Sequence, residues 1–241
     1  MAQALIGKKV IITGGSSGIG LATAKRLSSE GAEILIIGRS ESKLDKAQNE
    51  IGKNCKTHQL DVTNEKTISE FFNSSDNFDH LITPAADAAM GAFLELDSQT
   101  AMSLVESKLW GQYYCAKYAA PKLNDGGSIT FFSGIAGRKP MAGASTYALI
   151  AGAMESLTRT LALELAPIRV NCITPGVIDT PIWSELLPED IKATQLENIA
   201  SMLPVKRIGN VDDVAKAAFY TVDNSFVTGS IIDVDGGHRV T

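Results

Sequence analysis

The chain has 241 residues, enough for one large α/β domain, and its 44% hydrophobic and 20% charged residues are ordinary for a globular protein. The net charge of −5 comes without a basic cluster, and no apolar run approaches the roughly 20 residues of a membrane span, so neither nucleic acid nor a membrane is an expected partner. Three cysteines and three histidines lie scattered without ligand spacing, so we expect reduced thiols, no metal site and, because a strand begins near residue 10 with no signal peptide before it, a cytoplasmic protein.

Short apolar runs alternate with helical segments along the whole chain. The runs cover Val10–Thr13, Glu33–Ile37, Thr57–Leu60, His80–Thr83, Ser128–Ser133, Arg169–Ile173 and Ser230–Val234. Continuous apolar strands separated by helices predict a parallel sheet with helices on both faces. Right-handed crossovers then give an α/β fold of one domain, residues 1–241, with a doubly wound (Rossmann) sheet of about seven parallel strands that binds ligands beyond their carboxyl ends.

A glycine-rich loop joins the first expected strand to the first expected helix. The segment Thr13-Gly14-Gly15-Ser16-Ser17-Gly18-Ile19-Gly20 follows an apolar run and precedes the alanine-rich stretch Leu21–Leu27. Glycines permit a tight turn and a close approach to a pyrophosphate, whose charge the free N–H groups of the helix can meet. The order of strand, turn and helix predicts a dinucleotide site, with an ordinary glycine-rich loop as the alternative. Its residues are Gly14, Ser16, Ser17, Gly18, Ile19 and Gly20.

This octapeptide resembles the T-G-x-x-x-G-I-G signature of the short-chain dehydrogenase/reductase family, and later motifs resemble that family in the same order over nearly the whole chain. The resemblance implies that Asp61 and Val62 contact the adenine and that Asp235-Gly236-Gly237 ends the last strand. It also implies a strand and loop that hold the nicotinamide, with Arg169-Val170-Asn171, Pro175, Gly176, Ile178 and Thr180. A substrate lid over residues 181–204, the least regular stretch, and assembly as a homotetramer or homodimer are implied as well. A plain surface excursion is the alternative for the lid.

The end of the second expected strand indicates which nicotinamide cofactor is used. It reads Ile36-Ile37-Gly38-Arg39-Ser40. An NAD site usually has an acidic residue here that accepts hydrogen bonds from the ribose hydroxyls, and this chain has Gly38. Arg39 can instead pair with the additional phosphate of NADP, and Ser40 can add a hydrogen bond. We therefore expect NADP(H), with a solvated Arg39 as the alternative.

The resemblance implies that Tyr147 gives a proton to the substrate oxygen. Tyr147 enters an expected helix whose apolar positions recur every four residues, namely Leu149, Ala153, Leu157, Leu161 and Leu165. A free phenol has a pKa near 10 and needs help to exchange protons at neutral pH. In the family a lysine one helical turn later supplies a positive charge, and here that position is Ala151.

Three other positions depart from the family pattern. The serine expected thirteen residues before the tyrosine falls on Gly134, next to Ser133, and the asparagine of the fourth helix falls on Lys108. The Asn-Asn-Ala-Gly turn after the fourth strand reads Thr83-Pro84-Ala85-Ala86. Ala85 keeps the family residue as a cofactor contact, whereas Ala86 adds a methyl group close to the implied position of the cofactor ribose.

In the family the missing asparagine and lysine lie close together, joined by a water. We therefore hypothesise that Lys108 takes over the role of the lysine and uses room that the truncation at Ala151 opens. A buried unpaired ammonium is costly, and the alternative is that Lys108 reaches solvent and the site is inactive. Ser133 is the preferred orienting hydroxyl, and Ser145 is a second candidate that would equally suit a helix cap.

Two other pairs, Tyr113/Lys117 and Tyr118/Lys122, satisfy the same tyrosine-x-x-x-lysine spacing, but on the fourth helix this spacing is typical of an amphipathic surface. The preferred interpretation is an NADP(H)-dependent oxidoreductase acting on a small apolar ketone or aldehyde, with Tyr147, Lys108 and Ser133 as catalytic residues. Motif alignment predicts pocket walls from Met90, Phe93, Met141, Ile182, Trp183 and Leu186, with ordinary packing as the alternative. The rival interpretation is an inactive NADP-binding sensor or the inactive subunit of a mixed oligomer. An isomerase or dehydratase is a third possibility.

Overall fold

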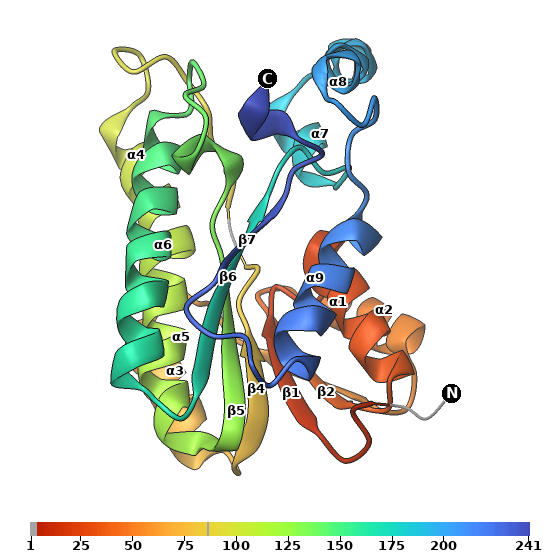
Figure 1. The fold of residues 1–241 in the computed structure, drawn as a ribbon, viewed down its shortest axis with the longest axis vertical. Helices are drawn as coiled ribbons and strands as arrows, with labels where there is room; N and C mark the ends of the chain where they lie inside the picture. Colours follow the sequence, from red (N-terminus) through yellow and green to blue (C-terminus); the bar gives the residue numbers. More distant parts are fainter. Residues whose placement is uncertain (1–3, 86) are drawn as a thin grey trace.

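A parallel sheet of seven strands forms the middle of the computed structural model, which describes residues 4–85 and 87–241 (Figure 1). The strand order is β3-β2-β1-β4-β5-β6-β7, and every pairing is parallel. The strands are β1 (Lys9–Thr13), β2 (Glu33–Gly38), β3 (Cys55–Gln59), β4 (Phe78–Ile82), β5 (Leu123–Phe132), β6 (Arg169–Pro175) and β7 (Ile231–Val234). The predicted doubly wound sheet is confirmed, and its order reverses between β1 and β4, where such sheets open a crevice.

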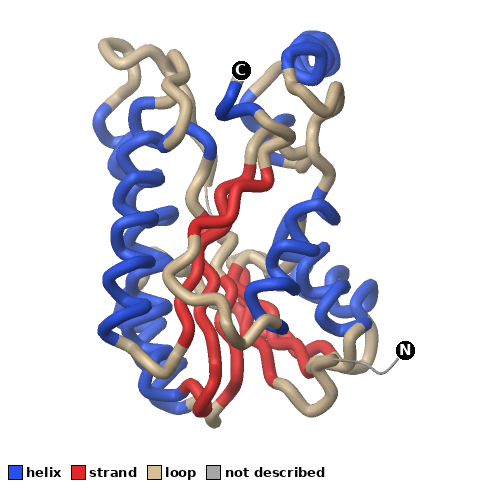
Figure 2. The backbone as a smooth tube through the Cα atoms, viewed as in Figure 1, coloured by secondary structure: helices blue, strands red, loops and turns tan. Residues whose placement is uncertain are grey.

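Helices cover both faces of the sheet, as Figures 1 and 2 show. In Figure 1, α3, α5 and α6 lie to the left of the strands, and α1, α2 and α9 lie to the right. The helices are α1 (Gly18–Ser29), α2 (Glu41–Ile51), α3 (Glu65–Ser74), α4 (Ser98–Val105), α5 (Gly111–Ala119), α6 (Ser145–Glu164), α7 (Ile182–Leu186), α8 (Glu189–Met202) and α9 (Val211–Asp223). Short turns complete the chain, namely η1 (Glu106–Trp110), η2 (Ala120–Lys122), η3 (Ile135–Gly137) and η4 (His238–Val240).

Two apolar cores lie on opposite faces of the sheet. Successive residues of β1 point to opposite faces, so Val10 and Ile12 join the core shared with α1, α2 and α9, while Ile11 joins the core shared with α3, α5 and α6. Burial on both faces is the reason that these strands read as continuous apolar runs. Among the described residues, no helix combines the length and the apolar character needed to cross a bilayer.

Some local predictions need correction. Strands β3 and β4 begin at Cys55 and Phe78, two residues before their predicted starts, and β5 begins at Leu123, five residues before its predicted start. The polar residues in β3 and at the start of β5 gave a weak signal. The stretch 181–204 is not irregular, since α7 and α8 occupy most of it. The helix predicted from the four-residue apolar repeat is α6, in which Leu149 is 60% exposed whereas Ile150 and Met154 are fully buried.

Candidate functional site

A cleft of about 710 Å³ lies beyond the carboxyl ends of the strands, within the size range of small-molecule sites. Its wall collects residues that follow six strands, from β1 to β6. The wall contains these residues predicted from the sequence to bind the cofactor or act in catalysis: Gly14, Ser16, Ser17, Gly18, Ile19, Gly20, Arg39, Ser40, Asp61, Val62, Ala85, Lys108, Ser133, Tyr147, Pro175, Gly176, Ile178 and Thr180. It contains neither Ser145 nor the strand residues Arg169-Val170-Asn171. The fold thus brings together side chains spread over more than half of the sequence.

The glycine loop closes one side of this cleft, and its turn and the start of α1 approach each other as closely as only glycine permits. Gly14 and Gly18 have φ values of +63° and +49°, in the left-handed region. A Cβ atom on Gly20 would lie 2.1 Å from the Gly14 carbonyl oxygen, so the start of α1 packs directly on the turn. Ser17 precedes α1 in an extended conformation and its side chain makes no capping hydrogen bond. The helix N-terminus is therefore left to an anion, and this cradle fits a pyrophosphate.

The adenosine end of the cleft holds charged groups from two loops. Arg39, just after β2, forms an ion pair with Asp87, with 2.6 Å between Nη2 and Oδ1. Ser40 precedes α2, and its hydroxyl oxygen accepts a hydrogen bond from the Lys43 amide at 3.4 Å, as a helix cap. Lys43 itself lines the cleft. Sequence reasoning missed Lys43, whose position one helical turn after Arg39 was an available signal, and Asp87, which has no motif around it.

Asp61 turns its carboxylate back onto its own loop. Its Oδ1 accepts hydrogen bonds from the backbone nitrogen and the hydroxyl of Thr63, both at 2.9 Å. The loop after β3 is thereby fixed in the cleft wall, where Val62 also packs against Gly111. This arrangement positions the loop as an adenine wall would require.

Tyr147 lies in the first turn of α6 and is half-buried in the cleft wall. The amide nitrogen of Ala89 donates a hydrogen bond to its hydroxyl oxygen at 3.3 Å. The other tyrosine–lysine pairs lie outside the cleft wall, where Lys117 and Tyr118 both contact Glu65. Tyr147 is thus the tyrosine of this cleft among the described residues.

The two candidate serines have different surroundings. The Ser133 hydroxyl lies 3.4 Å from the Ala151 carbonyl oxygen and 3.4 Å from Glu155 Oε1, so it faces α6. Gly134 is open, because an added Cβ would meet no described atom within 4 Å. Ser145 is exposed and lies outside the cleft wall. It is also not a cap, since α6 begins at Ser145 and Ala144 takes the cap position.

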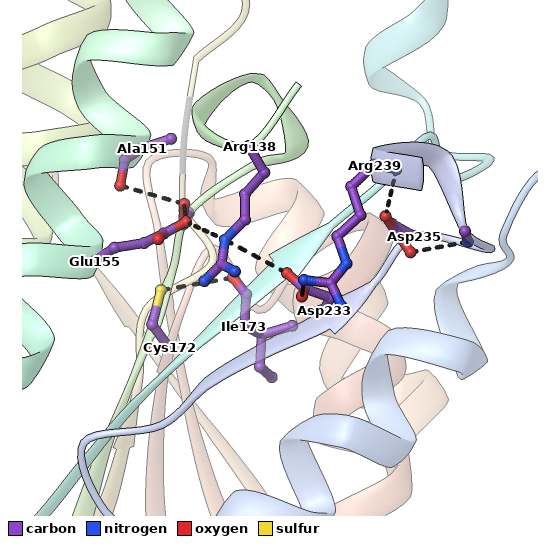
Figure 3. Close-up of polar contacts among 10 residues, drawn as sticks. Arg138, Ala151, Glu155, Cys172, Ile173, Asp233, Asp235 and Arg239 are labelled. Atoms are coloured by element: carbon purple, nitrogen blue, oxygen red, sulfur yellow. Dashed lines mark hydrogen bonds and ion pairs between the residues drawn. The ribbon is translucent and has the colours of Figure 1, made fainter. Parts of the chain in front are cut away.

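A network of charged side chains begins at Glu155, the residue that the Ser133 hydroxyl contacts. Glu155 Oε1 accepts a hydrogen bond from Arg138 Nε at 3.1 Å, and Arg138 lies 3.6 Å from Asp233 on β7 (Figure 3). Arg239 pairs with the second oxygen of Asp233 at 2.8 Å. Because Glu155 is two helical turns after Tyr147, about 12 Å along the helix axis, the Arg138 cation does not replace the missing lysine at the hydroxyl.

The position of the missing lysine is filled by backbone. Ala151 is 1% exposed, and a Cβ on Gly137 would lie 2.6 Å from the Ala151 Cβ. Turn η3 therefore packs directly on Ala151. The expectation that the truncation opens room for Lys108 is wrong, because this turn has closed onto the smaller side chain.

Lys108 lies in the π-helical turn η1. Such turns recur at functional sites because they shift a side chain out of the regular helical register. Lys108 lines the cleft, and its side chain, which ends in an amine, is partly buried. Burial lowers the pKa of this amine below its ordinary value, whereas the interaction with Cys172 raises it. The Lys108 amine therefore lies in partly buried surroundings on the side of β6.

Gln112 supports the turn that carries Lys108. Its Nε2 donates hydrogen bonds to the Lys108 and Phe132 carbonyl oxygens at 2.6 and 2.8 Å. Its Oε1 accepts hydrogen bonds from the Phe132 amide and the Thr83 hydroxyl at 2.8 and 2.9 Å. One buried amide thus joins the lysine turn to the ends of β4 and β5.

Apolar residues close the other end of the cleft. Of the predicted walls, Met90, Met141, Ile182, Trp183 and Leu186 line it. Phe93 does not, because it is 78% exposed and lies outside the wall. Trp183 Nε1 donates to the Ile178 carbonyl oxygen at 2.8 Å, which ties α7 to the loop after β6.

The described residues contain no group of three or more His, Cys, Asp or Glu side chains able to hold a metal ion. The expectation for Ala86 falls outside the described residues.

Comparison with known proteins agrees with this geometry. Residues 14–239 match the family model described as enoyl-(acyl carrier protein) reductase. The cis-4-hydroxycyclohexanecarboxylate dehydrogenase of Sinomonas cyclohexanicum is 33% identical, with 99% of each chain covered. Carbonyl reductase family member 4 of Xenopus laevis is 30% identical over 95% of this chain and 97% of that protein. A solved small-chain dehydrogenase in complex with NADPH is 35% identical, covers 97% of this chain and 99% of its own, and has a TM-score of 0.85.

The chain belongs to the short-chain dehydrogenase/reductase family. This family consists of oxidoreductases that use NAD(P)H, and the fold, the glycine loop and the cleft described above are those of such a protein.

Proposed function

We propose that this protein is an NADP(H)-dependent oxidoreductase that reduces a small apolar ketone or aldehyde, or oxidises the alcohol, with Tyr147 as proton donor. The observation that carries the proposal is the position of Tyr147 in the wall of the same cleft as the glycine loop and Arg39. A proton donor is thereby placed in the cleft that would hold the hydride source, which is the arrangement that carbonyl reduction requires.

The preference for NADP(H) is supported by charge. Arg39 and Lys43 line the adenosine end, and Gly38 stands where an acidic residue would accept the ribose hydroxyls of NAD. A guanidinium and an ammonium favour an additional phosphate. The NADPH bound by the related solved structure supports the same choice.

NADPH, which the glycine loop and Arg39 would hold, would supply a hydride with its two electrons to the carbonyl carbon. Tyr147 gives its hydroxyl proton to the carbonyl oxygen, on which negative charge develops as the C=O π bond opens. The Ala89 amide favours the phenolate that remains, because it donates to that oxygen at 3.3 Å. Lys108 is the proposed electrostatic partner of the Tyr147 hydroxyl. Ser133 orients the carbonyl only if its hydroxyl turns away from Ala151 and Glu155.

The closed packing at Ala151 favours a second function. The usual lysine position is filled by turn η3, and the Ser133 hydroxyl faces α6. A cofactor cleft beside a rebuilt proton-transfer site is what an inactive NADP-binding sensor, or the inactive subunit of a mixed oligomer, would have. Turnover distinguishes the two functions, because both bind the cofactor.

The test is NADPH oxidation with a panel of ketones, aldehydes and diketones, together with direct titration of NADPH. We expect Tyr147→Phe to lower kcat/KM by roughly 100-fold or more while the Kd for NADPH stays within about twofold. Tyr113→Phe, on the surface of α5, is the matched control. Lys108→Ala is compared in the same way with Lys117→Ala. Tight NADPH binding without turnover of any compound would favour the inactive sensor or subunit.

We further propose a homo-oligomer, a tetramer or dimer, in the cytoplasm. The apolar side chains Leu149, Leu163 and Met102 are 60%, 82% and 54% exposed on α6 and α4, which supports a partner on that side. The three cysteines are free and buried, in keeping with a reducing compartment. Light scattering at micromolar protein gives the molar mass, and a single 25.6 kDa species would contradict the oligomer.

A further inference from the structure

An ion pair crosses the adenosine end of the cleft and joins its two walls. Arg39 lies in the loop after β2 and Asp87 in the loop after β4. Arg39 Nη2 lies 2.6 Å from Asp87 Oδ1, and Nη1 lies 3.4 Å from Oδ2, so the carboxylate takes the fork of the guanidinium with both oxygens. Both residues line the cleft.

The same fork is the one that a phosphate would use. Carboxylates and phosphates both pair with a guanidinium through two parallel N–H donors, so they are alternative partners for one arginine. We infer that the Asp87 carboxylate competes with the 2′-phosphate of NADP(H) for Arg39 and so sets the affinity of this protein for that cofactor. The inference rests on the proposed cofactor and adds a residue that determines its specificity.

Asp87 cannot move far when a phosphate displaces it. Its backbone nitrogen donates a hydrogen bond at 3.3 Å to the buried hydroxyl of Ser107, which lies in the same turn η1 as Lys108. The displaced carboxylate can rotate, but it stays in the cleft wall beside a dianionic phosphate. The negative charges of the carboxylate and the phosphate repel each other, so Asp87 also weakens NADP(H) binding once the cofactor is bound.

Two other groups near Arg39 would support a bound phosphate after it displaces the Asp87 carboxylate. Lys43 lines the cleft in the first turn of α2, and its side chain is exposed. Gln59 Nε2 donates to the Arg39 carbonyl oxygen at 2.8 Å, which holds the backbone of the arginine in place. NADH carries no 2′-phosphate and does not compete with Asp87 for Arg39. Removal of the Asp87 charge therefore changes the Kd for NADPH and the Kd for NADH unequally.

The experiment is the titration of NADPH and of NADH into the wild type, Asp87→Asn and Asp87→Ser, followed by calorimetry. We expect both variants to lower the Kd for NADPH by roughly two- to fivefold, the size of an exposed ion pair, and to leave the Kd for NADH unchanged within error. Asp125→Asn removes the same charge at the exposed start of β5, away from the cleft, and is expected to change neither Kd.

The outcomes separate this inference from the proposed function. A wild type that prefers NADPH, with Asp87 variants whose NADPH affinity is unchanged or weaker, would overturn the competition and leave the cofactor assignment intact. Equal affinity of the wild type for NADH and NADPH, with Arg39→Ala changing neither, would overturn both.

Discussion

The amide nitrogen of Ala89 lies 3.3 Å from the hydroxyl oxygen of Tyr147, which joins the loop after β4 to the first turn of α6. Asp87, two residues earlier in the same loop, pairs with Arg39 at the other end of the cleft. The short segment 87–89 of this loop therefore contacts both the arginine proposed to bind the cofactor phosphate and the tyrosine proposed to donate the proton.

Removal of the Ala89 N–H tests its contribution to proton transfer. Proline at position 89 has no N–H to donate, so Ala89→Pro removes the hydrogen bond to Tyr147 and keeps a small side chain. Since a donor to this oxygen favours the phenolate, we expect the pH at which alcohol oxidation rises to move upward, and kcat to fall about tenfold at neutral pH. Ala89→Gly retains the donor and is expected to follow the wild-type pH–rate profile. Identical profiles for all three proteins would contradict a role for this amide.

Restoration of the family lysine is expected to fail. In Ala151→Lys the new stem must displace turn η3, whose Gly137 already packs on the Ala151 Cβ. Overpacking of this kind costs about 1–3 kcal/mol, and the displaced turn adjoins Ser133, so we expect lower stability and no gain in turnover. Urea denaturation gives the free energy of unfolding.

Asn49→Lys, at an exposed position of α2 away from the proposed oligomer contact, is the matched control. A stable Ala151→Lys protein with higher kcat would show instead that the site tolerates the usual lysine.

Loss of the Gln112 amide is expected to destabilise the protein and to disturb the lysine turn. In Gln112→Leu the Phe132 amide and the Lys108 carbonyl lose their side-chain partner in the buried interior. Each buried group left without a partner costs about 1–3 kcal/mol, so a loss of about 2–5 kcal/mol in the free energy of unfolding follows. Gln99→Leu, at an exposed position of α4, is the control and is expected to cost less than about 0.5 kcal/mol. A loss in Gln112→Leu no greater than in this control would show that water replaces the amide.

The fold and the phosphate end of the cleft could be predicted from the sequence because their signals are local. A strand, the glycine turn and the helix occupy consecutive residues, and burial on both faces of the sheet makes each inner strand a continuous apolar run. Arg39 was found in the same way, from its place directly after β2.

The rearranged part of the site could not be predicted because it depends on contacts between distant segments. The Arg39–Asp87 pair joins residues 48 apart, and Asp87 belongs to no motif. The packing of Gly137 on Ala151 follows from the path of turn η3, which no periodicity specifies. The buried face of α6 is likewise not specified by the sequence, because both faces of that helix carry apolar residues and only the sheet decides which one packs inward.

Acid sensitivity of the fold is expected at His80, far from the cleft in strand β4. The side chain is 4% exposed, its Nδ1 lies 2.8 Å from the Ser128 hydroxyl, and burial lowers its pKa from 6.5 to about 4 against the opposing effect of Asp79. Because the unfolded chain takes up a proton near pH 6.5 and the folded chain only near pH 4, stability is full above pH 6.5 and falls as the pH drops through this window. At about 1.4 kcal/mol for each pH unit, the loss amounts to about 3 kcal/mol.

Urea denaturation at several pH values between 7.5 and 4.5 measures this loss. We expect His80→Gln to be less stable than the wild type at neutral pH and to lose less stability on acidification, since glutamine does not titrate. His58→Gln, at an exposed position of β3, is the matched control and is expected to keep the wild-type dependence on pH. If His80→Gln retained the full slope between pH 6.5 and 4.5, another group would be responsible for the acid sensitivity.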